Sequence, residues 1–112
     1  MDVKVIKDIE NLINWFLPMV SKFPRNYRYT LGNRLEEHLY SVLEDVIQAQ
    51  YSKKKNYFLQ RGNLTIEMLR HLVRISFKQK LLSSKQYEAF AKQLNTIGSQ
   101  IGGWKKEREN NE

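Results

Sequence analysis

Cysteine is absent from the 112 residues of the chain, and histidine and proline occur only twice each. Without cysteine the chain cannot form disulfides, carry a thiolate nucleophile or bind zinc through sulfur. Two histidines are too few for a histidine-rich metal site, so we expect no metal and no cofactor. No apolar run reaches the roughly 20 residues of a membrane span, and charges interrupt the N-terminal stretch where a secretory signal would lie. These absences predict a soluble, cytoplasmic protein.

Acidic residues are also scarce: 12 Asp and Glu stand against 19 Lys and Arg, which gives a formal net charge of +7. Residues 22–34 contain no acidic residue, and residues 46–87 contain only Glu67. Net charge bears on partners and solubility rather than on fold, and unneutralised Lys and Arg favour a polyanionic partner. The charge pattern therefore predicts that the chain binds a polyanion.

Apolar residues recur every three or four positions through most of the chain, and the strict alternation typical of strands is absent. This spacing is that of amphipathic helices, and short breaks separate four such segments. The expected helices span about residues 6–20, 31–55, 57–80 and 84–101. Because 112 residues suit one domain, we predict an all-α fold. Residues 1–104 are expected to form an antiparallel up-down-up-down four-helix bundle.

Local signals refine these boundaries. Pro18 lies inside the first pattern and predicts a kink in that helix. Ser83 or Ser84 is a suitable N-cap for the last helix. The pair Gly102-Gly103 predicts the C-terminal end of that helix, because glycine readily takes the positive φ found at such ends. Residues 105–112 are then expected to form a short, charged and frayed tail.

Three basic residues of the third predicted helix follow each other at intervals of four, so they line one face. They are Arg70, Arg74 and Lys78. Like charges at this spacing repel by roughly 0.2–0.5 kcal/mol per pair in an isolated helix. A helix that keeps such a stripe is expected to face an anion, and a solvated face is the alternative interpretation.

Two further basic clusters strengthen the prediction of a polyanionic partner. The first lies between the second and third predicted helices, beside the aromatic residues Tyr51 and Tyr57, and the second lies in the acid-free stretch 22–34. Their members are Lys53, Lys54 and Lys55 in the first, and Arg25, Arg28 and Arg34 in the second. Basic side chains neutralise phosphates without reading sequence, and aromatic rings stack on exposed bases. We therefore expect nucleic-acid binding of low sequence specificity and strong salt dependence.

Other polar side chains carry weaker signals. His38 and His71 lie on different predicted helices without the spacing of a ligand set, so we interpret both as packing or surface residues. An acidic group on the second helix suggests an outer charged face rather than paired catalytic carboxylates. Its members are Glu36, Glu37, Glu44 and Asp45. Because nucleophile-elbow, P-loop and dinucleotide motifs are also missing from the sequence, we expect no enzymatic activity.

Two glycines and two tryptophans predict close packing. Gly32 and Gly98 lie within helical patterns, where glycine costs about 1 kcal/mol relative to alanine. We expect another helix, from the chain itself or from a second subunit, to approach each of them closely. Trp15 and Trp104 are expected to pack as amphipathic caps on the bundle.

Several of these runs together resemble a known four-helix-bundle family, the one that includes Avd. Avd is the accessory variability determinant of diversity-generating retroelements. The resemblance covers about residues 12–105, and its most specific parts are the Thr-Leu-Gly that follows Phe-Pro-Arg and the Gly-Gly-Trp near the end. The matching runs are Trp15-Phe16-Leu17-Pro18, Lys22-Phe23-Pro24-Arg25, Arg28-Tyr29-Thr30-Leu31-Gly32, Leu72-Val73-Arg74 and Gly102-Gly103-Trp104.

The resemblance implies a non-enzymatic protein that assembles as a basic homopentamer. It implies binding to nucleic acid and to the retroelement's reverse transcriptase. With that enzyme and the template-repeat RNA, such proteins support the adenine-randomised cDNA synthesis that diversifies a target gene, and DNA is a further expected ligand. Carried over by position, Arg70 and Arg74 are the first residues expected to contact these partners. Arg25, Arg28 and Arg34 are the second choice.

Two alternatives remain at the level of sequence. The chain is also similar to the four-helix-bundle proteins encoded in ribosomal-RNA intervening sequences, although its basic charge favours the Avd type. A scaffold whose basic face meets an acidic protein is the other alternative, and an enzyme is a distant third. Neither helical periodicity nor charge alone identifies the reverse transcriptase, which rests on the resemblance.

Overall fold

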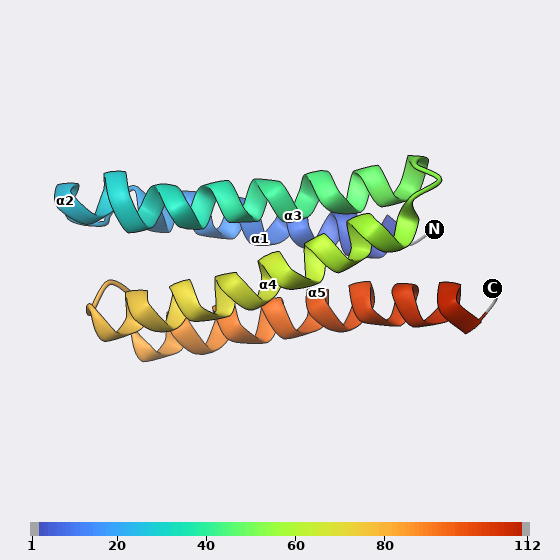
Figure 1. Ribbon diagram of the computed structural model, residues 1–112. Helices are drawn as coiled ribbons and strands as arrows, with labels where there is room; N and C mark the ends of the chain where they lie inside the picture. The colour runs from blue at the N-terminus through green and yellow to red at the C-terminus, as the bar shows by residue number, and fades with distance from the viewer. Residues whose placement is uncertain (1–2, 111–112) are drawn as a thin grey trace.

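The computed structural model describes residues 3–110, and the side chains of residues 4–106, as a bundle of long helices joined by short connections (Figure 1). The elements are α1 (Val3–Val20), α2 (Arg25–Tyr27), the π-helix η1 (Arg28–Gly32), α3 (Asn33–Tyr51), α4 (Lys55–Lys78) and α5 (Ser84–Asn110). The four long helices run in alternating directions along a molecule of 48 × 22 × 20 Å. The start of α1 and the end of α5 lie at the same end of the bundle. The predicted all-α antiparallel four-helix bundle is confirmed.

One hydrophobic core runs the length of the bundle and receives the apolar face of every long helix. Its largest fully buried side chains are Phe16 from α1 and Phe90 from α5, whose ring centroids lie 5.6 Å apart. Leucine, isoleucine and valine from all four long helices fill most of the remaining volume. Burying each such side chain contributes roughly 1.5–3 kcal/mol, so the pairing of apolar faces decides the order and direction of the helices.

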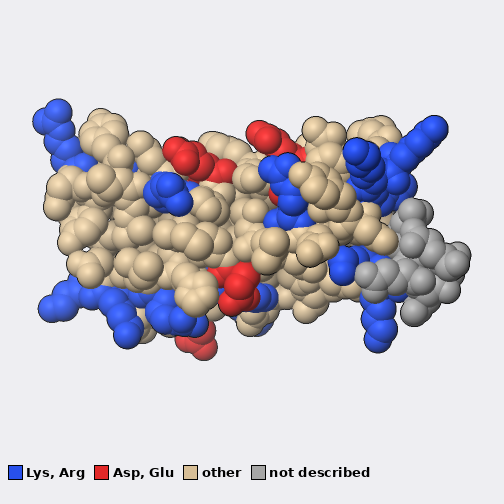
Figure 2. All heavy atoms as spheres, viewed as in Figure 1, with Lys and Arg blue, Asp and Glu red and all other residues tan. Residues whose placement is uncertain are grey.

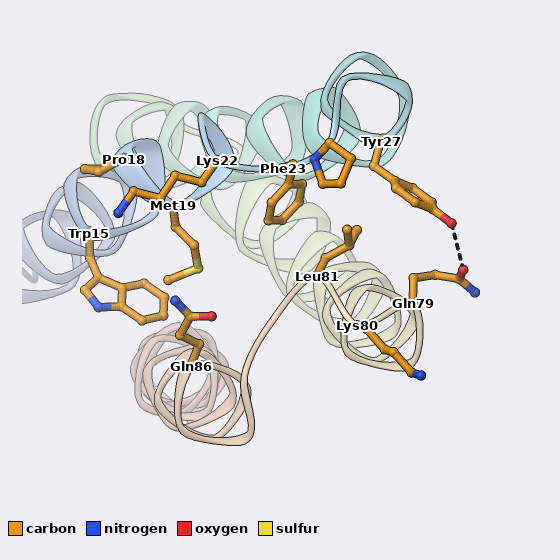
Figure 3. A pocket seen from close by; sticks show the side chains of 11 residues that line it. Trp15, Pro18, Met19, Lys22, Phe23, Tyr27, Gln79, Lys80, Leu81 and Gln86 are labelled. Carbon is orange, nitrogen blue, oxygen red and sulfur yellow. Dashed lines mark hydrogen bonds between the residues drawn. The ribbon is translucent and has the colours of Figure 1, made fainter.

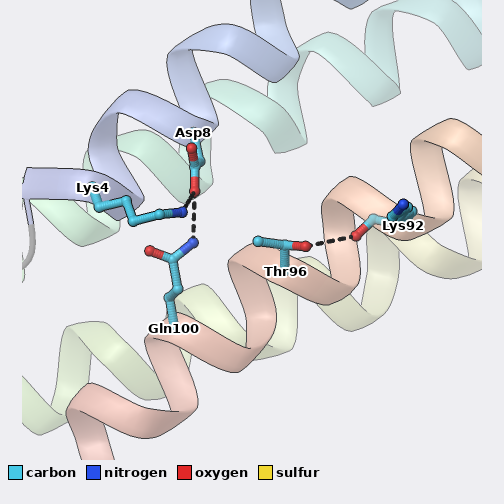
Figure 4. A network of polar contacts seen from close by, with 5 residues as sticks. All are labelled: Lys4, Asp8, Lys92, Thr96 and Gln100. Atoms are coloured by element: carbon cyan, nitrogen blue, oxygen red, sulfur yellow. Dashed lines mark hydrogen bonds and ion pairs between the residues drawn. The ribbon is translucent and has the colours of Figure 1, made fainter.

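A polar contact ties α1 to α5 where the first and last helices close the bundle (Figure 4). The carboxylate oxygen Oδ2 of Asp8 accepts hydrogen bonds from Lys4 Nζ and from Gln100 Nε2, both at 2.8 Å. The hydrogen bonds from Lys4 and Gln100 lower the pKa of Asp8 below its usual value. This contact joins residues from opposite ends of the sequence.

The second predicted helix begins earlier and ends earlier than expected. Helical backbone starts at Arg25, directly after Pro24, and continues through the π turn of η1 into α3, which ends at Tyr51 rather than near Lys55. Side chains supply hydrogen bonds around the π turn: the Thr30 hydroxyl donates to the Asn26 carbonyl at 2.8 Å. The residues between Pro24 and Tyr51 therefore act as one long helix with a widened turn near its start.

The last helix also differs from the expectation. Its start is as predicted, because Ser83 and Gln86 form a reciprocal capping box: the Ser83 backbone N–H donates to Gln86 Oε1, and the Gln86 N–H donates to Ser83 Oγ. The expected end at Gly102-Gly103 is wrong, since α5 continues to Asn110. Neither glycine takes a positive φ, and the partly buried Trp104 holds the helix against the core beyond them. The expected tail is therefore helical as far as residue 110, and residues 111–112 lie outside the described part.

The two glycines at predicted close contacts do lie against neighbouring elements. A Cβ atom at Gly32 would come within 2.7 Å of Val20 Cγ2, so the end of α1 packs directly on the backbone of η1. A Cβ atom at Gly98 would lie 3.0 Å from Arg70 Nη2, so a side chain of α4 covers the backbone of α5. Both approaches are made within the chain.

We predict opposite effects for alanine at two of the glycines. Gly32→Ala should lower the free energy of unfolding by about 1–3 kcal/mol, because the buried Val20 must move to admit the new methyl group. Gly103→Ala should raise it by up to about 1 kcal/mol, because no atom lies within 4 Å of the new Cβ and alanine favours the helix. Urea unfolding followed by circular dichroism measures both, and equal effects would contradict the packing described at Gly32.

Candidate nucleic-acid interface

The antiparallel fold brings two acid-free stretches of the sequence together at one end of the bundle. The hydroxyl of Tyr27 in α2 donates to Gln79 Oε1 in the turn after α4, at 2.9 Å, and so joins residues 22–34 to residues 68–87 (Figure 3). We call the basic residues of this region the basic end. They are Lys22, Arg25, Arg28, Arg34, Lys78, Lys80 and Lys85.

Acidic side chains do little to neutralise the cations of the basic end. All its members except Arg28 are exposed, and none forms an ion pair within the part of the chain that the structure describes. On the face shown in Figure 2, basic side chains gather toward both ends of the molecule and acidic ones lie nearer its middle. Closely spaced charges of one sign raise the local potential and concentrate counter-ions or an anionic partner.

Some of the predicted site residues are already engaged in holding the fold. Arg28 Nη2 donates to the Phe23 carbonyl at 3.3 Å, and its guanidinium lies 6.0 Å from the centre of the Tyr29 ring. Lys55 Nζ donates to the carbonyls of Ala49 and Gln50, each at 2.9 Å, and so caps the C-terminal end of α3. Arg28 thus stabilises the connection after α1, and Lys55 stabilises the connection between α3 and α4.

The three basic residues that line one face of α4 have different environments in the structure. Arg70 is half-buried, pairs with Glu67 Oε2 at 2.8 Å and lies over Gly98 of α5. Arg74 and Lys78 are exposed, and neither has a side-chain partner among the described residues. The unneutralised part of the stripe therefore runs from Arg74 toward the basic end.

The remaining predicted cluster lies at the opposite end of the molecule. Lys53 and Lys54 occupy the connection between α3 and α4, and both are exposed. The 24 residues of α4 separate them from Lys78 by roughly 35 Å at 1.5 Å per residue. The predicted site residues therefore form two separate basic surfaces rather than one.

Lys22 and Lys80, which sequence periodicity did not single out, both belong to the basic end. Lys80 follows α4 in a Schellman arrangement: its N–H donates to the Phe77 carbonyl at 2.9 Å, and the next N–H donates to the Ser76 carbonyl at 3.0 Å. Its φ of 63° lies in the left-handed region, which costs a residue with a side chain about 1 kcal/mol. Glycine is usual at this position, so the lysine is not explained by the turn.

Asp45 corrects the prediction of an outer acidic face on α3. Glu37 and Glu44 are exposed and Glu36 is half-buried, but Asp45 is buried, with only 4% of its surface exposed. Its helical phase turns it toward α4, where Oδ1 lies 3.6 Å from Arg61 Nε. Burial raises the pKa of Asp45, and the charge of Arg61 opposes that rise. The charge of the neighbouring Glu44 raises the pKa of Asp45 further.

The histidines lie apart and make local contacts. His38 Nδ1 is 2.8 Å from the Arg34 carbonyl, and the exposed His71 lies 3.6 Å from Glu67. No group of three or more acidic or histidine side chains that could hold a metal ion occurs among the described residues. No helix in residues 3–110 is both long and apolar enough to cross a membrane.

An apolar stripe crosses the outer face of α4. Leu64, Met68 and Ile75 follow helical spacing and expose 64%, 39% and 47% of their surfaces. Tyr40, Ile47 and Tyr51 form a similar stripe on α3. Large apolar side chains exposed in a row mark surfaces that other proteins cover.

Comparison with known families gives a match over nearly the whole chain. A family described as bAvd-like matches residues 4–108, a range that includes nearly all of the four long helices and the whole basic end. The comparison with curated proteins gives no match. The residues that match the family are thus the same residues whose geometry is described above.

Proposed function

Because the chain belongs to the bAvd-like family, we propose that it is a non-enzymatic accessory protein of a diversity-generating retroelement. In this role it binds nucleic acid and the retroelement's reverse transcriptase. Together with the template-repeat RNA, the complex carries out the mutagenic cDNA synthesis that diversifies a target gene. The chemistry belongs to the reverse transcriptase, and the bundle contributes binding surfaces.

The observation that carries the nucleic-acid part of this proposal is the basic end. Two acid-free stretches that are distant in sequence meet there, and their exposed cations have no ion-pair partners among the described residues. Lys and Arg in such an arrangement bind phosphates and release the counter-ions condensed on the nucleic acid. Phosphate contacts carry no sequence information, so we expect the basic end to bind the backbone of RNA or DNA with low sequence specificity.

The predicted site residues differ in whether their side chains are available to contact a partner. Arg25, Arg34, Arg74 and Lys78 are exposed and form the main contact surface. Lys53 and Lys54 form a second surface at the far end, suited to a long RNA or to the reverse transcriptase. The three engaged cations, Arg28, Lys55 and Arg70, hold the surfaces in place.

We propose further that the chain assembles as a homopentamer through the apolar stripe of α4. Leu64, Met68 and Ile75 offer a row of exposed side chains whose burial against a second copy would be favourable. The pentamer number itself comes from the family. Assembly would place several basic ends in one particle, and several phosphate contacts together would strengthen binding to one RNA.

Charge reversal at the basic end should weaken nucleic-acid binding. In the double variant Arg25→Glu with Lys78→Glu, we expect the affinity for single-stranded RNA to fall at least about tenfold. The slope of log affinity against log salt should flatten by about 1 to 2, since each lost phosphate contact removes roughly 0.7. Fluorescence anisotropy of a labelled oligonucleotide at several salt concentrations measures both quantities.

The matched control is Lys53→Glu with Lys54→Glu, which makes the same change of charge at the other end. We expect a smaller loss of affinity in the control, and circular dichroism should show both variants to be helical. Failure of the unchanged protein to bind RNA or DNA even at low salt would overturn the nucleic-acid proposal. Equal losses in the two double variants would overturn its assignment to the basic end.

Acidic substitution in the apolar stripe should dissociate the assembly. Leu64→Glu with Met68→Glu is expected to reduce the mass measured by light scattering to that of one 13.4 kDa chain. Asn95→Glu with Ser99→Glu is the control, because it places two charges at the same spacing on an exposed face of α5. A monomeric unchanged protein would contradict the assembly, and equal dissociation in the control would contradict the role of the stripe.

A further inference from the structure

A cavity of about 420 Å³ opens at the basic end, between the connection from α1 to α2 and the turn from α4 to α5 (Figure 3). Trp15, Met19 and Gln86 lie on one side of it, Tyr27 and Gln79 lie on the other, and Leu81 stands between the two sides. Its volume falls within the range of pockets that hold small organic molecules. The cavity thus has room for a ligand the size of a single nucleotide.

The lining of the cavity favours an anionic ligand. Lys22 and Lys80 belong to the lining, which contains no aspartate or glutamate. Both lysines are exposed, and neither has an ion-pair partner among the described residues. In Figure 3 the two side chains extend from opposite sides of the cavity, so the phosphates on either side of a bound nucleotide would each meet one ammonium group. No carboxylate in the lining competes with them.

The two glutamine side chains in the cavity wall have free hydrogen-bond donors. Gln86 Oε1 accepts from the Ser83 N–H, and Gln79 Oε1 accepts from the Tyr27 hydroxyl. Each amide therefore keeps its NH₂ group for another acceptor. The NH₂ group of Gln86 lies beside Trp15, whereas that of Gln79 lies on the opposite side of the cavity (Figure 3). Ring nitrogens and carbonyl oxygens of nucleobases are such acceptors.

An aromatic surface completes the cavity. The half-buried Trp15 is held by an edge-to-face contact with Phe90, with centroids 5.5 Å apart and an interplanar angle of 88°. Its ring therefore has a fixed position in the cavity wall. Nucleobases stack on aromatic side chains with little preference for sequence.

The backbone at Lys80 gives an independent reason to expect a role for its side chain, because glycine would fit this turn better. Its backbone has a φ of 63°, in the left-handed region where glycine is usual. A residue kept in an unfavourable conformation at the rim of a cavity points to a role for its side chain. Substitution by glycine separates that role from folding, since it should stabilise the turn while removing the ammonium group.

We propose that this cavity binds one unstacked nucleotide of a single-stranded RNA or DNA. The base lies against Trp15 and accepts from the Gln86 amide, and the phosphates on its two sides contact Lys22 and Lys80. The inference rests on the proposed nucleic-acid function and adds to it a defined pocket for one base. An acidic peptide would use the same lysines but has no base to place against the indole.

The test uses the fluorescence of Trp15 as a local probe. Trp104→Phe removes the other tryptophan, which lies roughly 21 Å along α5 from Phe90, the ring that contacts Trp15. In this background, titration with unlabelled oligo(dT) or oligo(U) should change the Trp15 emission with the affinity that anisotropy gives for the same oligonucleotide. An acidic peptide of equal charge should leave the emission unchanged.

Lysine variants in the same background report the phosphate contact. Lys80→Gly and Lys22→Gln should each weaken binding about three- to tenfold and flatten the salt slope by roughly 0.7, the value for one phosphate contact to a single strand. Lys80→Gly should raise the melting temperature, which excludes misfolding as the cause. Lys92→Gln, an exposed lysine of α5 outside the cavity, is the control and should change affinity less than twofold.

The outcomes separate this inference from the function on which it rests. If anisotropy shows binding while Trp15 emission stays constant and Lys80→Gly binds like the parent, the pocket is refuted and the nucleic-acid function stands. If anisotropy shows no binding of any oligonucleotide, the function and the pocket both fail. A response of Trp15 to the acidic peptide would also refute the assignment to a nucleotide.

Discussion

The burial of four apolar helix faces in one antiparallel core is the constraint on which the rest of this structure depends. It sends the chain back and forth along one axis, so the connection after α1 and the turn after α4 must lie at the same end. The contact of Val20 with the backbone at Gly32 and the hydrogen bond from Tyr27 to Gln79 fix that junction. Packing that has nothing to do with charge therefore decides which basic residues become neighbours.

Gathering like charges in this way opposes folding, and the core offsets it. Local pairs such as Arg70 with Glu67 neutralise the middle of α4, whereas Lys78 and Lys80 at its end have no acidic partner among the described residues. The left-handed backbone at Lys80 adds a further small cost. Cations without acidic partners and a strained lysine around one cavity suit the phosphate-bearing partner proposed above for this member of the bAvd-like family.

Patterns that depend on near neighbours in sequence were sufficient for the fold. Helical periodicity predicted the four long helices, and the Ser83 capping signal predicted the start of α5. The prediction that α5 ends at Gly102-Gly103 was wrong, because the position of a helix end depends on the packing of the residues that follow. Here Trp104 packs against the core, and the helix continues. The spacing of Asp45 from Val42 and Ala49 already placed it on the apolar face of α3, but its partner Arg61 on α4 could not be read from spacing. Nor could the π turn at Arg28–Gly32, where Val20 of α1 packs against Gly32. The candidate site was less predictable: its charges were evident, but their division between two ends required the topology, and their roles remain predictions.

Co-purification with the reverse transcriptase tests the central claim most directly, namely that this bundle is its accessory partner and that the basic end carries the binding. The protein is co-expressed with the reverse transcriptase and template-repeat RNA of the same retroelement, and the mass and composition of the purified complex are measured. We predict one complex of all three components with the unchanged chain, and loss of RNA when the cations of the basic end are reversed. Recovery of enzyme and RNA without the bundle protein would contradict the account.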